Sequence, residues 1–103
     1  MRQLMIVAIA ASLLGCAGAT LADMDMLKKN NCIACHAVDS AVFGPAFKAI
    51  AKKYADDAAA QARLAQKIRA GGVGVWGESP MPPQPQVSEA DAQTLAKYIL
   101  SLE

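Results

Sequence analysis

Two cysteines and a histidine form the strongest chemical signal in the sequence. They are Cys32, Cys35 and His36, in the order Cys-Ile-Ala-Cys-His. Residues three and four positions apart share one face of a helical turn, so both thiols and the imidazole point the same way. This spacing is typical of covalent haem attachment, in which two thioether bonds hold the porphyrin and the imidazole binds the iron. Because His36 is the only histidine in the chain, no second imidazole can complete the coordination of the iron.

A Cys-x-x-Cys pair has other uses, which are a thioredoxin-like redox pair, a plain disulfide or part of a zinc site. A redox pair of that kind is expected beside a strand–helix–strand pattern, and this sequence shows none. A structural zinc site needs four ligands, whereas the only other cysteine is Cys16, which precedes the domain. These points favour haem and leave a disulfide as the main alternative.

The second side of the iron needs a further ligand, and the candidates are Met24, Met26 and Met81. The first two closely precede the cysteines and are typical packing residues. Met81 lies in Pro80-Met81-Pro82-Pro83, where the prolines restrict the backbone and can hold a weak thioether ligand in place. A His/Met pair raises the reduction potential and favours electron transfer. The alternative function is a haem enzyme or gas sensor in which Met81 is absent from the iron.

Four helices are expected to position these residues, because apolar residues recur at helical spacing and no useful stretch alternates with a period of two. We expect them at about 24–31, at about 46–54, after Asp57 to about 70, and at 88–102. Residues 71–87 are rich in proline and glycine, which predicts a stiff extended loop and excludes a helix or an ordinary strand. The fold class is therefore all-α, in one small domain whose thin core suggests a bound cofactor.

The start of the chain is typical of an export signal. Residues 1–22 of the 103 hold one charge, Arg2, an apolar run at Leu4–Leu14 and small residues up to Ala22. The apolar run is shorter than the roughly 20 residues of a membrane span. Cleavage after Ala22 is expected to leave residues 23–103 as the mature domain. The ten basic residues less Arg2 balance nine acidic ones there, and this zero side-chain charge excludes a typical nucleic-acid binder.

Cys16 gives the export signal a second interpretation. Leu13-Leu14-Gly15-Cys16 resembles a lipobox, in which the cysteine is lipidated and anchors the domain by a short tether. The Thr20-Leu21-Ala22 sequence favours cleavage after Ala22 and a domain without an anchor. Both interpretations place the domain outside the cytoplasm, in the periplasm.

Three further segments accompany the Cys-x-x-Cys-His motif: Phe43-Gly44-Pro45-Ala46-Phe47-Lys48, Gly74-Val75-Trp76-Gly77 and Pro80-Met81-Pro82-Pro83. With these segments, the mature sequence resembles the small bacterial class I cytochromes c of the c-551/c-552 type. The resemblance implies a cytochrome c fold, with about four helices around one covalently bound haem c. It also implies an electron carrier, not an enzyme, whose partners are redox proteins such as a nitrite reductase, a terminal oxidase or an upstream cytochrome.

The same resemblance implies roles for several side chains. The carbonyl of Pro45 would accept a hydrogen bond from His36, although a plain turn proline is the alternative. The indole of Trp76 would donate to a haem propionate, with core packing as its alternative. Lys67 or Arg69 would help to neutralise the propionates, unless each lies on a solvated helix face.

Two departures from the family pattern are visible. Gln84 stands where many relatives carry an asparagine whose amide steadies the methionine sulfur, so a mobile methionine orientation or a shifted potential is expected. Lys67 stands where relatives commonly carry arginine. A lysine cannot donate the two parallel hydrogen bonds with which a guanidinium binds a propionate.

Uncharged residues beside the motif segments are candidates for contact with redox partners. They are Ala41, Val42 and Val73. Transient redox encounters bury little surface, and a domain without net charge steers partners weakly over long distances. We therefore expect a monomer with brief encounters and a modest salt dependence.

Overall fold

The computed structural model describes residues 23–103 of the chain. Cys16 and the predicted signal segment lie outside the described residues. The elements are α1 (Met24–Lys29), the 3-10 helix η1 (Cys32–Ala34), α2 (Phe47–Lys53), α3 (Ala60–Ala70), β1 (Gly72–Gly74), β2 (Gly77–Met81) and α4 (Glu89–Leu100). Within residues 23–103, no helix is both long and apolar enough to cross a membrane.

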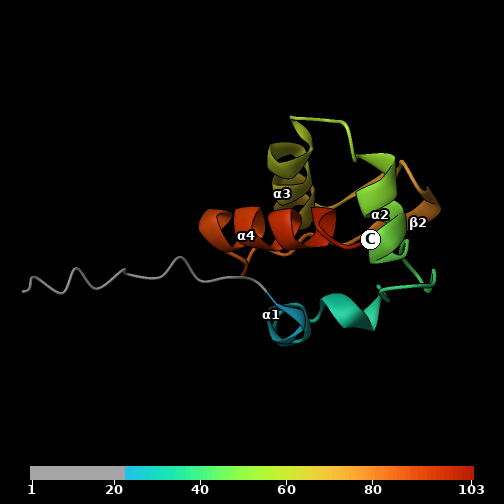
Figure 1. The fold of residues 1–103 in the computed structure, drawn as a ribbon. Coiled ribbons are helices and arrows are strands. Elements are labelled where there is room, and N and C mark those ends of the chain that lie inside the picture. Colours follow the sequence, from blue (N-terminus) through green and yellow to red (C-terminus); the bar gives the residue numbers. More distant parts are fainter. Residues whose placement is uncertain (1–22) are drawn as a thin grey trace, which may run out of the picture.

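Helix α4 is the centre of the packing. It contacts both α3 and α2, and Figure 1 shows it lying across α3 with its C-terminal end beside α2. The apolar faces predicted for these helices are confirmed, since Phe47, Ile68 and Leu95 are all buried in one cluster. Buried alanines such as Ala92 and Ala96 belong to the same cluster and let the helices approach closely. The all-α class is confirmed.

The ends of α3 and α4 follow from their local sequence. Ser88 Oγ accepts a hydrogen bond from the backbone N–H of Asp91 at 3.1 Å, as expected of the residue that caps α4. Asp57 Oδ1 accepts from the N–H of Ala59 at 2.9 Å, so this carboxylate caps the turn that leads into α3. Helix α3 ends at Gly71, whose φ of +70° is in the region that favours glycine.

The first helix is shorter than its sequence predicts. It ends at Lys29 instead of continuing to Asn31, because Asn31 takes a left-handed conformation with φ 62°. The chain then starts a separate helical turn, in which the N–H of His36 donates to the carbonyl of Cys32 at 2.9 Å. The predicted one-turn spacing of the cysteines and the histidine is therefore kept within that turn.

The prediction that residues 71–87 contain no ordinary strand is wrong for the first half of this segment. Strands β1 and β2 pair antiparallel, with Gly72 opposite Met81 and an irregular register toward Gly74 and Gly77. Each strand has only one partner, and proline is tolerated in an edge strand of this kind. The segment after Met81 holds no helix or strand until α4, as predicted.

Candidate functional site

A cavity of about 300 Å³ lies between the η1 turn, α2, α3 and the β1–β2 pair. Cys32, Cys35, His36 and Met81 all line it, together with many apolar side chains from the helices. A second groove, between α3 and α4, is lined by no cysteine, histidine or methionine. The cavity therefore gathers the predicted cofactor ligands from distant parts of the sequence.

The His36 imidazole is held by contacts on several sides. Its Nδ1 lies 2.8 Å from the carbonyl oxygen of Pro45, and its ring stacks on Phe47 with centroids 5.1 Å apart and planes at 24°. A Cβ at Gly44 would lie 2.5 Å from the imidazole Cε1, so only glycine leaves room for the ring there. Because Nδ1 donates to a carbonyl, the lone pair is on Nε2, the nitrogen suited to a metal.

Backbone hydrogen bonds fold the loop of Gly44 and Pro45 onto the cysteine-histidine turn. The N–H of Gly44 donates to the carbonyl of Cys35 at 2.8 Å, and the N–H of Phe47 donates to the carbonyl of Ala37 at 2.9 Å. The second bond involves the first residue of α2, whose N–H has no partner within its own helix. These bonds bring the glycine, the proline carbonyl and the phenylalanine ring to the imidazole.

Cys32 does not have the lowered pKa of a catalytic redox thiol. Both cysteine side chains are half-buried, and burial raises the pKa of the Cys32 thiol above its usual value. A raised pKa keeps the thiol protonated and unreactive at neutral pH, whereas catalytic redox cysteines have lowered values. The strand–helix–strand unit of such proteins is also absent from residues 23–103. The structure therefore favours covalent attachment over thiol redox chemistry.

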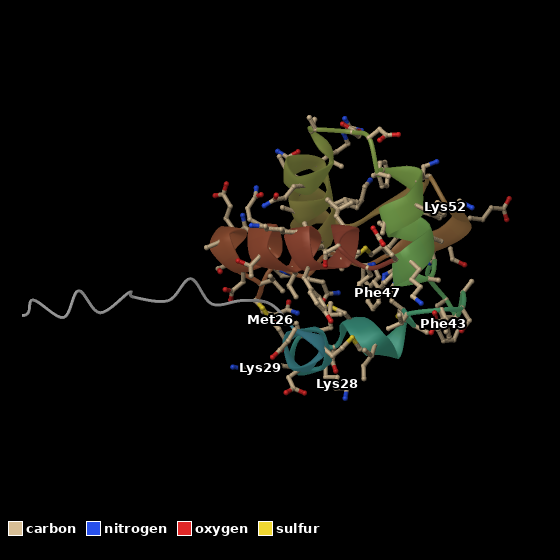
Figure 2. The ribbon with its side chains drawn as sticks, viewed as in Figure 1. Met26, Lys28, Lys29, Phe43, Phe47 and Lys52 are labelled. Carbon is tan, nitrogen blue, oxygen red and sulfur yellow. The ribbon has the colours of Figure 1, made fainter. Side chains whose placement is uncertain are left out.

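Met81 is the only one of the three candidate methionines that lines the cavity. It is half-buried at the end of β2 and packs against the core cluster. Met24 and Met26 are also half-buried against that cluster, but they lie on α1 and do not line the cavity. Figure 2 shows Met26 on α1. Their predicted role as packing residues agrees with this placement.

The donors and the lining of the cavity fit a haem group. Two thiols and one imidazole come from one turn, a thioether comes from the opposite end of the sequence, and the remaining walls are mostly apolar. This combination suits haem, a flat and largely apolar ring. The cysteine sulfurs would tether the ring, and the imidazole nitrogen and the thioether sulfur would bind its iron.

The side chains that the resemblance assigns to the propionates differ in position. Trp76 lines the cavity but is 44% exposed in the turn between the strands, and the Lys53 ammonium lies 5.2 Å from its ring centre. Lys67 also lines the cavity and passes close to Gly72. Arg69 does not line it, because its Nε donates to the carbonyl of Val87 at 3.1 Å. Of the two cations, Lys67 is the better placed.

Gln84 lines the cavity, but its amide is engaged within its own loop. Its Nε2 donates to the carbonyl of Pro82 at 3.3 Å, and its Oε1 accepts from Gln86 at 2.7 Å. The amide therefore has partners other than the methionine sulfur.

The sequence alone did not reveal two contacts to the imidazole. Gly44 was recognised only as part of a motif, and Phe47 only as a core residue of α2. The available signal was a glycine directly before the proline that was expected to bind the only histidine.

Comparison with known proteins places the chain in a family. Residues 17–103 match the Cytochrome c family. Cytochrome c-552 from Nitrosomonas europaea is 57% identical over 94 residues, which cover 91% of each chain. Cytochrome c-551 from Pseudomonas aeruginosa is 53% identical over 85 residues, covering 82% of this chain and 81% of the relative.

The fold agrees with these sequence matches. The crystal structure of wild-type cytochrome c552 from Nitrosomonas europaea superposes with a TM-score of 0.77 at 58% identity, covering 79% of this chain and all of the other. The chain therefore belongs to the cytochrome c family, as a small class I electron carrier that binds one haem c covalently and is not an enzyme.

Proposed function

We propose that this cytochrome carries single electrons between respiratory proteins in the periplasm, with His36 and Met81 as the two axial ligands of its haem iron. The observation that carries the proposal is the shared cavity, which both side chains line although 45 positions separate them in the sequence. Cys32 and Cys35 supply the two thioether sulfurs, and the Pro45 carbonyl fixes the tautomer of His36 through Nδ1.

The ligand pair decides what the site does. When bound, haem c supplies a one-electron Fe(III)/Fe(II) couple. Met81 fills the position that oxygen or peroxide needs, and its thioether sulfur favours the ferrous state, which raises the potential. The apolar walls favour the same state, because a low-polarity environment disfavours extra positive charge.

The charged edge of the haem is assigned to two residues of the cavity lining. Trp76 would donate its indole N–H to a propionate oxygen. The indole N–H can only donate, and a propionate oxygen can accept. Lys67 neutralises propionate charge from α3, as a point charge without the bidentate fork of arginine.

The partners are redox proteins such as a nitrite reductase, a terminal oxidase or an upstream cytochrome. Ala41, Val42 and Val73 are exposed, the last two at 58% and 62%, and Phe43 beside them is more exposed still. An uncharged surface of this kind supports brief contacts by a monomer.

The proposal includes export of the domain from the cytoplasm. Residues 1–22 act as a signal that is removed after Ala22, which leaves residues 23–103 in the periplasm. The alternative, lipid attachment at Cys16, anchors the same domain to a membrane surface.

Three measurements on the purified holoprotein test the proposal. The mass of the intact protein reports its first residue, any lipid and the bound haem together, and we expect Asp23 as the start with no lipid. We expect a weak far-red band in the ferric state, typical of thioether bound to iron(III), and no immediate binding of carbon monoxide in the ferrous state. Immediate carbon monoxide binding to the native protein would instead indicate an open iron position, as in a haem enzyme or gas sensor.

A further inference from the structure

The segment that carries Met81 has little burial of its own. From Gly77 to Gln86, every residue except Met81 and Gln84 is exposed. Prolines stiffen the backbone of this segment, but stiffness alone does not fix its position against the rest of the domain. Something outside the segment must therefore hold it over the cavity.

Strand β1 pairs with the first half of the segment, and the C-terminal end of α3 contacts the chain from Met81 onward. The carbonyl of Ile68 accepts a hydrogen bond from the N–H of Gln84 at 3.1 Å, and Arg69 Nε donates to the carbonyl of Val87 at 3.1 Å. At Gly71, a Cβ would collide with the Met81 carbonyl oxygen and would lie 2.8 Å from the Pro83 nitrogen. Ile68, Arg69 and the cap residue Gly71 thus contact the chain between Met81 and Val87.

We propose that Arg69 is a positioning residue for Met81: it ties the distal end of the methionine segment to α3 and so keeps the thioether over the cavity. The proposal rests on the proposed ligation of iron by Met81. It also gives Arg69 a role other than the propionate contact expected from the sequence, since this side chain does not line the cavity.

The chemistry of the contact suits this role. Val87 is 1% exposed and directly precedes the residue that caps α4, so its carbonyl lies at a fixed point of the core. A guanidinium Nε–H is a charged donor in a rigid plane, and its charge near the C-terminal end of α3 is also favourable. Lysine carries the same charge without the planar donor, so charge and geometry can be separated by substitution.

The test is the affinity of ferric holoprotein for imidazole, a neutral ligand that binds the iron only when the methionine leaves. We expect Arg69→Met to tighten imidazole binding about three- to tenfold, since one charge-assisted hydrogen bond no longer stabilises the closed segment. Arg69→Lys should lie between Arg69→Met and the wild type. Gly71→Ala should tighten binding as well, because its Cβ displaces the Met81 backbone.

Lys97→Met is the matched control, because this exposed lysine lies on α4 and does not line the cavity. It should leave imidazole affinity within about 1.5-fold of the wild type, while unfolding in denaturant records the global stability of every variant.

An unchanged affinity in Arg69→Met, or an equal change in Lys97→Met, would overturn the proposal. A loss of global stability without tighter imidazole binding would do the same, since it indicates only a structural role. If the wild type lacks the far-red band, the ligation by Met81 fails and this proposal fails with it.

Discussion

The two sides of the cavity are built in different ways. On the imidazole side, residues 32–47 are tied together by backbone hydrogen bonds, and His36 contacts three residues of one short loop and the following helix. On the thioether side, residues 77–87 are largely exposed, and they are held by the pairing of β2 with β1, by hydrogen bonds within the loop and by two hydrogen bonds to the end of α3. The first side is held by dense contacts around the imidazole, whereas the second depends on proline stiffness, on one short strand and on the end of one helix.

This difference matches the strength of the proposed ligands. An imidazole flanked by two covalent thioether bonds stays close to the iron even if its surroundings loosen. A thioether is weak and has no covalent tether, so its position must come from the protein frame. We therefore expect changes on the methionine side to alter ligation and potential, and changes on the histidine side to alter stability.

The largest effect is expected from Met81→Ala. Loss of the thioether should remove the far-red band, open the iron to carbon monoxide and lower the reduction potential by a sizeable part of the roughly 0.8 V over which axial ligands tune haem. Absorption spectra and potentiometric titration measure these changes. Met26→Ala is the control, because Met26 does not line the cavity and should keep the band. A Met81→Ala protein with an unchanged band would show that another group binds the iron.

On the histidine side, Gly44→Ala should lower the free energy of unfolding by about 1–3 kcal/mol, because the new methyl group overlaps the imidazole. Denaturant unfolding of the holoprotein measures the loss. Gly74→Ala serves for comparison, since its Cβ meets nothing within 4 Å and only the positive φ of +104° is strained. Equal losses in the two variants would mean that crowding of His36 is not the cause.

A smaller effect is expected from Trp76→Phe. The proposed indole hydrogen bond would favour the ionised propionate, so its removal should raise the propionate pKa and move the pH dependence of the potential upward by less than about 1 pH unit. Potentials measured across the pH range report this directly. If Trp76 only packs against its neighbours, stability falls while the pH profile stays in place.

The smallest effect concerns ionic strength. Since the mature side chains sum to zero charge, the electron-transfer rate with a physiological partner should change by no more than about threefold between 0.01 M and 0.15 M salt. Stopped-flow measurements across this range provide the test. A steep decrease with added salt would point to docking through charged residues instead.

The sequence predicted the helices because their signals are local. Phe47 and Ile50 recur at helical spacing in α2, as Leu95 and Ile99 do in α4, and Ser88 caps α4 through a hydrogen bond within one turn. The Cys-x-x-Cys-His turn is equally local, since its geometry follows from positions three and four apart.

Contacts between distant segments were not predictable in the same way. The pairing of Gly72 with Met81 depends on how the chain returns past α3, and no alternation of side chains announces it. Arg69 and Val87 are 18 residues apart, so an arginine on a helix face gave no sign of the carbonyl that it binds. The resemblance to a family supplied the bond between His36 and Pro45, which periodicity alone does not indicate.

We propose that His36 and Met81 both bind the haem iron. A crystal structure of the ferrous holoprotein distinguishes this ligation from any other. We expect Nε2 of His36 and the sulfur of Met81 within bonding distance of the iron, with Nδ1 of His36 still donating to Pro45. An iron whose second axial position holds water, Lys67 or any other side chain would contradict it.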